Sequence, residues 1–130
     1  MILYIDTTSK DALIKLVGEK EYTLNWSSQD LTLELLGNIE KLINQQNLAI
    51  SDITEIAVNQ GPGSYTGTRI GVAVANALDY TLNIPVYGFG NDEKISDIKD
   101  VIGNKAKKAK EFVKVKYTAP AKITLTRKAS

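Results

Sequence analysis

The groups of this sequence that could do chemistry gather in one glycine-rich segment. Residues 61–71 read GPGSYTGTRIG, and they follow a predicted strand and precede a predicted helix. The start of a helix has unpaired backbone N–H groups and a partial positive charge, so it can bind a phosphate or a carboxylate. If this segment binds an anion, the binding groups are expected to come from Gly61, Gly63, Ser64 and Gly67.

The two familiar phosphate-binding motifs do not match this segment. A P-loop requires a lysine directly before its Ser or Thr, but here Gly67 precedes Thr68. A dinucleotide-binding loop requires the spacing G-x-G-x-x-G, and here one extra residue precedes Gly67. The alternative is a tight strand-to-helix turn, in which the glycines allow positive φ and close packing and Pro62 stiffens the bend. The residue types alone leave both interpretations open.

Asp6, at the end of the first predicted strand, is the acid best placed for chemistry. It could hold a metal ion beside a phosphate, or its side chain could cap the turn that follows. Two-metal hydrolysis requires several converging acids, and Asp6 is the one that the sequence identifies. The chain contains no histidine and no cysteine, so the commonest general base and metal ligands are missing. No catalytic residue, metal or cofactor is therefore expected, and a binding role is favoured.

The hydrophobic pattern predicts an α/β domain around this segment. Apolar runs and alternation predict strands, and apolar residues spaced by three and four predict helices. Strands are predicted over residues 2–5, 12–17, 22–26, 53–59 and 83–89, and helices over residues 31–43 and 66–80. The element order β-β-β-α-β-α-β predicts a mixed sheet flanked by helices. Pro85 predicts that the last strand lies at an edge or begins there.

The two predicted helices differ in composition. Ser27 and Ser28 are predicted N-caps of the first helix, and Asn47 is predicted to end it. One apolar stripe of this helix should face the sheet: Leu31, Leu35, Leu36, Ile39, Leu42 and Ile43. Leu33 and Leu48 lie off this stripe and are candidates for contact with a partner. The second helix is crowded with small residues, which allow close approach of another element: Gly71, Ala73, Ala75 and Ala77.

Charge divides the chain unevenly. Residues 1–104 contain 14 acidic and 7 basic side chains, a formal −7, whereas residues 105–130 contain 9 basic side chains and one acid, a formal +8. Such an end can meet tRNA phosphates or an acidic partner, or it can be a solvated surface that aids solubility. A short helix is predicted over residues 92–102 through Ile95, Ile98 and Ile102, and a strand over residues 112–117. No stretch is apolar over the roughly 18 residues that a bilayer requires, and the missing cysteines fit the cytoplasm, which is the expected location.

Residues 61–71 are similar to the signature GPGSFTGLRIG of the TsaB (YeaZ-type) family, with Tyr65 in place of Phe and Thr68 in place of Leu. The opening ILYIDTTS resembles the family's first strand and its Asp-Thr turn. SDITEIAVNQ and NIPVYGF also fall where the family has strands. The resemblance covers roughly residues 1–90, and the element order is that of the ribonuclease H-like half-domain of actin-like ATPases.

The resemblance implies an actin-like (ASKHA) fold, normally built from two lobes. Residues 1–90 are expected to form the N-terminal lobe, and residues 91–130 a short basic remnant of a truncated second lobe. The family implies a non-catalytic partner of TsaD, the subunit that transfers a threonylcarbamoyl group to adenosine 37 of tRNA. It also implies a TsaE-like ATPase as a further partner, and a homodimer as an alternative to the TsaD heterodimer.

Family members contact TsaD, or a second copy, through helices of the N-terminal lobe. Carried over to this chain, the expected interface residues are Leu33, Leu36, Arg69, Ile70, Ala73 and Ala77. Two other functions remain open. One is a minimal actin-like nucleotide-binding or phosphotransfer domain that uses Asp6 and residues 61–67. The other is a homodimeric module that binds nucleic acid or a partner through the basic end of the chain.

Overall fold

The computed structural model describes residues 1–91. Its elements follow the predicted order, with one short 3₁₀ helix, η1 (Ile50–Asp52), added before the fourth strand. The strands are β1 (Ile2–Asp6), β2 (Asp11–Val17), β3 (Glu21–Ser27), β4 (Glu55–Asn59) and β5 (Val86–Phe89). The helices are α1 (Leu31–Gln45) and α2 (Tyr65–Leu82).

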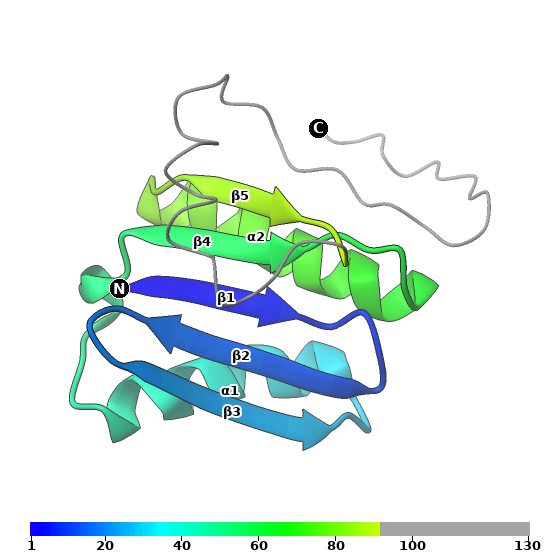
Figure 1. Ribbon diagram of the computed structural model, residues 1–130, viewed down its shortest axis with the longest axis horizontal. Helices are drawn as coiled ribbons and strands as arrows, with labels where there is room; N and C mark the ends of the chain where they lie inside the picture. Colours follow the sequence, from blue (N-terminus) through cyan, green and yellow to red (C-terminus); the bar gives the residue numbers. More distant parts are fainter. Residues whose placement is uncertain (92–130) are drawn as a thin grey trace.

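The five strands form one mixed sheet in the order β3-β2-β1-β4-β5 (Figure 1). β2 is antiparallel to both β1 and β3, whereas β4 is parallel to β1 and to β5. The register places Ile5 opposite Ile14 on one side and Val58 on the other. Among the described strands β5 lies at an edge of the sheet, as predicted from Pro85. It begins at Val86 because Asn83, in the left-handed conformation with φ of 57°, ends α2 just before it.

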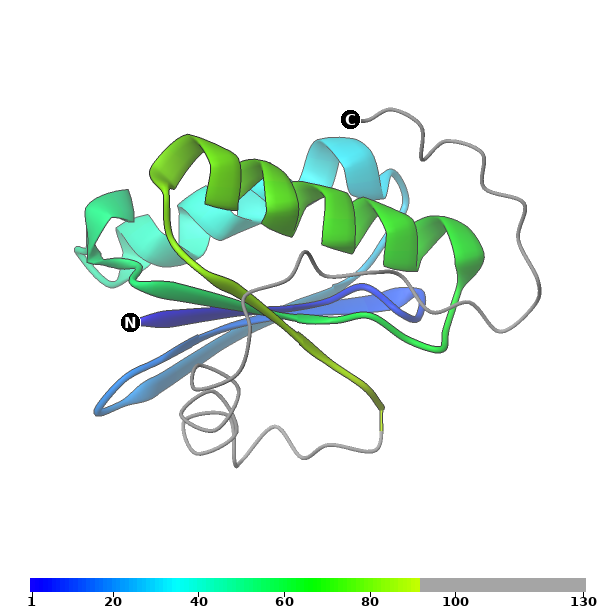
Figure 2. The same ribbon diagram turned by 90° about the horizontal axis from the view of Figure 1, so that it is seen from above.

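Both described helices lie on the same face of the sheet (Figure 2). Alternate strand residues point toward the helices because the side-chain period of a strand is two. They pack with the apolar stripes of α1 and α2 into the main core, which contains Leu3, Ile5, Ile14, Leu16, Ile56, Val58, Leu35, Ile39, Leu42, Ile43, Val72 and Ala75. The prediction of an α/β sheet is confirmed, but within residues 1–91 the helices cover only one of its faces.

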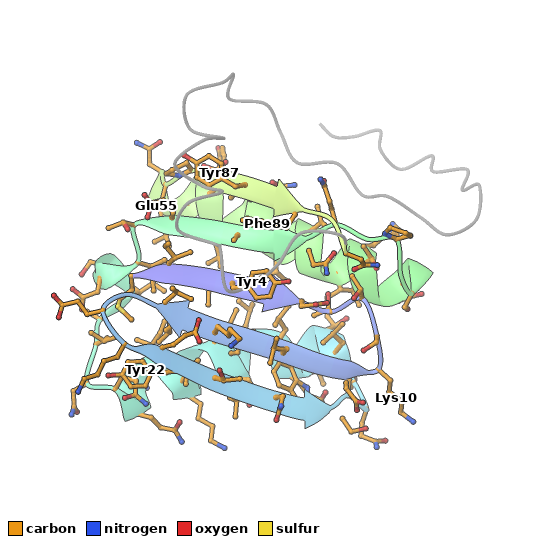
Figure 3. All side chains as sticks on the ribbon, in the orientation of Figure 1. Tyr4, Lys10, Tyr22, Glu55, Tyr87 and Phe89 are labelled. Carbon is orange, nitrogen blue, oxygen red and sulfur yellow. The ribbon has the colours of Figure 1, made fainter. Side chains whose placement is uncertain are left out.

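The opposite face of the sheet carries a second apolar cluster. Its buried members are Ile2, Tyr4, Val17, Ala57 and Phe89, and Leu13 and Tyr87 pack against them. Tyr4 and Phe89 meet edge to face with ring centroids 6.2 Å apart. Figure 3 shows Tyr4, Tyr87 and Phe89 on this face, with both helices behind the sheet. We call these seven residues the open-face cluster.

The start of α1 differs from the prediction. Ser27 is the last residue of β3 and pairs with Asp11 in the sheet, so it cannot act as a cap. Ser28 does not cap either, because its hydroxyl donates a hydrogen bond to the Glu34 carboxylate at 3.2 Å. Asp30 occupies the N-cap position without a side-chain hydrogen bond. The predicted serine caps are therefore wrong, whereas Asn47 lies just beyond the end of α1 with φ of 56°, as its predicted helix-ending role requires.

Glu34 ties the start of α1 to β3. Its carboxylate also accepts hydrogen bonds from the Trp26 indole N–H at 3.1 Å and from the Gln29 backbone N–H at 3.2 Å. Partial removal from water raises the pKa of Glu34, but hydrogen bonds from the backbone of Asp30 and Gln29 and from the Trp26 and Ser28 side chains outweigh this effect. The pKa of Glu34 therefore lies below its usual value of 4.5, and the carboxylate stays ionised at neutral pH.

The predicted helix over residues 92–102, the predicted strand over residues 112–117 and the basic run all lie outside the described residues. Within residues 1–91, neither helix combines the length and the apolar character that crossing a membrane requires.

Candidate functional site

The glycine-rich segment packs against the turn that follows β1. The Thr7 hydroxyl donates to the carbonyl oxygen of Gly67 at 2.6 Å, and the Ser64 N–H donates to the carbonyl oxygen of Thr8 at 2.7 Å. The carboxyl end of β1 and the amino end of α2 are therefore in direct contact. This contact leaves little room for side chains between the two segments.

The glycines are required by this close approach. A Cβ added at Gly63 would lie 2.5 Å from the Thr8 Cβ, and one added at Gly67 would lie 2.4 Å from the Thr7 carbonyl oxygen. At Gly71, about one turn after Gly67, an added Cβ would lie 2.2 Å from the Thr7 hydroxyl oxygen. These distances are too short for real Cβ atoms, so the spacing of the glycines follows from packing against residues 7 and 8.

The backbone N–H groups that would bind an anion already donate hydrogen bonds to other groups of the chain. The Gly61 N–H donates to the Asn59 side-chain oxygen at 2.9 Å. The Ser64 N–H donates to Thr8, as described, and the Gly67 N–H donates to the Ser64 hydroxyl at 3.2 Å. Ser64 is thus the N-cap of α2. Gly61 has φ of 99°, the positive φ that the turn interpretation predicts. The geometry favours the strand-to-helix turn over a phosphate cradle.

Asp6 caps the turn after β1. Its Oδ1 accepts hydrogen bonds from the Thr8 N–H at 3.0 Å and from the Thr8 hydroxyl at 2.7 Å. Its Oδ2 accepts one from the Asn59 side-chain amide at 3.2 Å. No group of three or more His, Cys, Asp or Glu side chains in residues 1–91 is placed to hold a metal ion. The carboxylate of Asp6 is therefore used to hold the ends of β1 and β4 together.

Two asparagines that the sequence did not single out complete this network. The Asn59 amide nitrogen donates to the Asn91 side-chain oxygen at 2.9 Å, and the Asn91 amide donates to the Pro62 carbonyl oxygen. Asn59 ends β4 and is 5% exposed. Because β1 and β4 are parallel neighbours, their carboxyl ends lie side by side. The strand order could therefore have identified Asn59 as a partner of Asp6. The network fixes the glycine-rich turn relative to three strand ends.

Thr68 stands in the sequence where the TsaB signature has leucine. Its side chain is fully buried, and its hydroxyl oxygen has no hydrogen-bond partner among the described residues. We expect Thr68→Val to raise the free energy of unfolding by about 1 kcal/mol, because valine keeps the branched shape and removes an unsatisfied buried hydroxyl. Urea denaturation measures this as a higher midpoint at unchanged slope. Thr66→Val, at an exposed position of α2, is the matched control; a lower midpoint for Thr68→Val would contradict the prediction.

The predicted interface residues of α1 are exposed. The exposed fraction of Leu33 is 75% and that of Leu36 is 52%. Glu34 points toward β3, where it contacts Trp26 and Ser28. Leu36 follows Glu34 by two residues, about 200° around the helix, so it points to the other side of α1, toward α2. Leu36 therefore does not belong to the buried stripe to which the spacing assigned it.

The predicted interface residues of α2 fall into two groups. Ala73 and Ala77 are exposed, and Arg69, one turn before Ala73, is half-buried. Ile70 is also half-buried, and it packs against the main core. Leu48, the other candidate off the buried stripe of α1, likewise packs against the core. The structure thus brings Leu33, Leu36, Ala73 and Ala77 to the helix-covered side of the lobe as exposed positions.

Sequence reasoning missed two residues on this side. Tyr80, one turn beyond Ala77 on α2, has an exposed fraction of 91%. Gly37 lies in the middle of α1, and a Cβ added there would meet nothing within 4 Å. A glycine in a helix interior weakens the helix, so its position within the leucine pattern was the available signal. Together with Leu33, Leu36, Ala73 and Ala77, these residues form what we call the helical face.

The comparisons with known proteins agree with this fold. The profile of the family described as "TsaD: tRNA N6-adenosine threonylcarbamoyltransferase" matches residues 25–91. The tRNA threonylcarbamoyladenosine biosynthesis protein TsaB of Bacillus subtilis (strain 168) is 33% identical over 99 residues, which are 73% of this chain and 43% of that protein. The structure of YeaZ from Pseudomonas aeruginosa superposes with a TM-score of 0.65 at 27% identity, over 68% of this chain and 43% of that chain.

A threonylcarbamoyltransferase is also similar to part of the chain. The tRNA N6-adenosine threonylcarbamoyltransferase of Clostridioides difficile (strain 630) is 38% identical over 55 residues, 42% of this chain and 16% of that enzyme. The chain spans less than half the length of these relatives. Its described residues form an actin-like (ASKHA) lobe, and by its fold and its matches the chain belongs to the TsaD-type family of this profile, with the TsaB (YeaZ-type) proteins.

Proposed function

We propose that this chain is a non-catalytic TsaB-like subunit that binds a TsaD homologue and supports threonylcarbamoylation of adenosine 37 in tRNA. The observation that carries the proposal is the helical face, where Leu33 and Leu36 are 75% and 52% exposed. Large apolar side chains on neighbouring turns of one helix mark an interaction surface when they are not needed for the core. Neither Leu33 nor Leu36 belongs to the main core or packs against it.

A TsaD-family protein is the partner that this surface fits best. The matched residues 25–91 contain both α1 and α2, so a TsaD-family partner carries the corresponding pair of helices. Two related lobes can pack through equivalent helices, as the subunits of a two-fold symmetric dimer do. A second copy of this chain would present the same helices. The helical face would therefore be used both in a heterodimer with a TsaD homologue and in a homodimer.

The polar end of the lobe supports a non-catalytic role. The Asp6 carboxylate and the N–H groups of Gly61, Ser64 and Gly67 all have partners within the chain. A nucleotide site would have to break these hydrogen bonds to obtain its donors and its metal ligand. We therefore place the contribution of this chain in binding, and leave the transfer chemistry to the TsaD homologue.

Reconstitution with the TsaD homologue of the same organism tests the proposal. We expect size-exclusion chromatography with light scattering to show a 1:1 complex, and the yield of threonylcarbamoyladenosine in tRNA to rise when the full chain is added to TsaD and the other pathway proteins. A titration calorimetry run with ATP and Mg²⁺ serves as the comparison for the enzyme alternative. If the chain neither binds TsaD nor changes the yield, or if it binds ATP at micromolar concentration, the proposal is wrong.

A further inference from the structure

An acidic side chain continues the row of exposed leucines on the helical face. Glu40 is exposed on α1, four residues after Leu36 and seven after Leu33. At these spacings it lies within about 40° of both leucines around the helix axis. Residues four apart on a helix are neighbours, so Glu40 extends the row by one further turn. The row that marks the interaction surface therefore ends in a carboxylate.

No neighbour on α1 neutralises this carboxylate. Ion pairs within a helix form between residues three or four apart. The residues at these distances from Glu40 are all uncharged: Leu36, Gly37, Ile43 and Asn44. Glu34, the other acid of α1, is held by the Trp26 indole and the Ser28 hydroxyl instead. Among residues 1–91, the Glu40 side chain forms no ion pair, so its carboxylate is left to water or to a partner.

A second copy of this chain is a poor match for Glu40. A two-fold symmetric interface uses the same patch on both copies, so a homodimer through the helical face would take two Glu40 carboxylates out of water. Arg69, the base of α2, is half-buried and already interacts within the chain. Lys41, the base of α1, lies about 100° from Glu40 around the helix. Burial of a carboxylate without a matching cation is costly.

We propose that Glu40 selects the partner of the helical face. It disfavours a second copy of this chain and favours a TsaD homologue that places a lysine or an arginine opposite the carboxylate. This proposal rests on the proposed function and adds the chemistry of the contact. A charge within an apolar row of a helix sets the choice of partner at some cost in stability, as polar residues at the core positions of coiled coils do.

Glu40→Gln tests the proposal, because glutamine keeps the size of the side chain and removes its charge. We expect analytical ultracentrifugation to show self-association tighter than that of the wild type by about 10-fold or more, since the like charges are gone. Titration calorimetry with the TsaD homologue should show a Kd raised by about 10-fold, since the partner's cation loses its counter-charge. A variant that merely damaged α1 would weaken both associations, whereas the proposal requires them to change in opposite directions.

Glu19→Gln is the matched control. Glu19 is an exposed acid in the turn between β2 and β3, and its substitution changes the net charge by the same one unit. Both association constants should stay close to wild type in this variant, and both variants should keep a wild-type Tm because the positions are exposed. Equal effects of the two substitutions would assign the change to net charge and overturn the role of Glu40.

Charge reversal identifies the cation of the partner. Glu40→Lys should weaken binding of the TsaD homologue by more than about 100-fold, because it places like charges opposite each other. A Lys→Glu or Arg→Glu substitution on the matching helices of the TsaD homologue should then restore most of the lost affinity.

The results separate this proposal from the proposed function. If the wild-type chain binds the TsaD homologue and Glu40→Gln changes neither association, or changes both in the same direction, the selection by Glu40 is wrong and the proposed function stands. If none of the reversals in the partner restores binding to Glu40→Lys, no cation lies opposite Glu40 and the proposal is wrong. If the wild-type chain does not bind the TsaD homologue, the proposed function fails, and this proposal fails with it.

Discussion

Leu36→Glu is expected to weaken binding of the TsaD homologue by about 100-fold or more while the lobe stays folded. Leu36 is 52% exposed on the side of α1 that faces α2, so glutamate at this position remains hydrated in the free chain. In the complex, its carboxylate would be buried against an apolar partner surface without a matching charge. Truncation of a hot-spot side chain at the centre of an interface costs about 2 kcal/mol or more of binding free energy, and a buried charge adds to that cost.

Lys41→Gln is the matched control for Leu36→Glu. It changes the net charge by the same one unit on the same helix, but at an exposed position about 140° from Leu36 around α1. Titration calorimetry should give a nearly unchanged Kd for Lys41→Gln, and both variants should keep a wild-type Tm. Wild-type affinity in Leu36→Glu would remove Leu36 from the interface, and a large loss in Lys41→Gln would place the contact on the β3 side of α1 instead.

The elements of this lobe could be predicted from the sequence because their determinants are local. Alternation in β2 and the spacing of Leu35, Ile39 and Leu42 in α1 follow directly from strand and helix geometry. The role of Asp6 was also local, since its strongest partner, Thr8, is two residues away. For the same reason the left-handed position of Asn47 near the end of α1 was predictable from residue type.

The polar network and the capping of α1 could not be predicted, because their partners meet only in the folded sheet. Asn59 reaches Asp6 across 53 residues of chain, and Asn91 reaches Asn59 across 32. Ser28 was predicted to cap the helix from its residue type, but its hydroxyl donates a hydrogen bond to Glu34 on the first turn of α1. Residue type determines which hydrogen bonds a side chain can form. The positions of the segments in the folded sheet determine which of them it does form.

The same limit applies to the helical face. The spacing of Leu36 fits the buried stripe of α1, but its side chain is 52% exposed. The contact between Glu34 and β3 explains this, because it fixes how α1 is rotated on the sheet. Leu48 lies beyond the stripe and was therefore a candidate for contact with a partner, yet it packs against the core. An apolar residue at the border of a helical stripe can be core or surface, and the orientation of the helix on its sheet makes the difference.

Gly67→Ala is expected to lower the free energy of unfolding by about 1–2 kcal/mol, although alanine is the better helix former. The added Cβ would lie 2.4 Å from the carbonyl oxygen of Thr7. This obstacle is backbone and is held by the β1 ladder, so relief requires α2 to shift away from β1. Such a shift would also strain the hydrogen bond from the Thr7 hydroxyl to the Gly67 carbonyl. Overpacking of this kind costs about 1–3 kcal/mol, which exceeds the gain in helix propensity of about 1 kcal/mol.

Gly37→Ala separates the steric cost from the effect of helix propensity. Gly37 is also a helical glycine, but nothing lies within 4 Å of an added Cβ. Alanine there should therefore raise the free energy of unfolding by about 0.5–1 kcal/mol. Urea denaturation of the two variants should give midpoints on opposite sides of the wild-type value. If Gly67→Ala matched or exceeded Gly37→Ala in stability, the glycine spacing of residues 61–71 would have to be explained by a ligand rather than by the contact between α2 and the turn after β1.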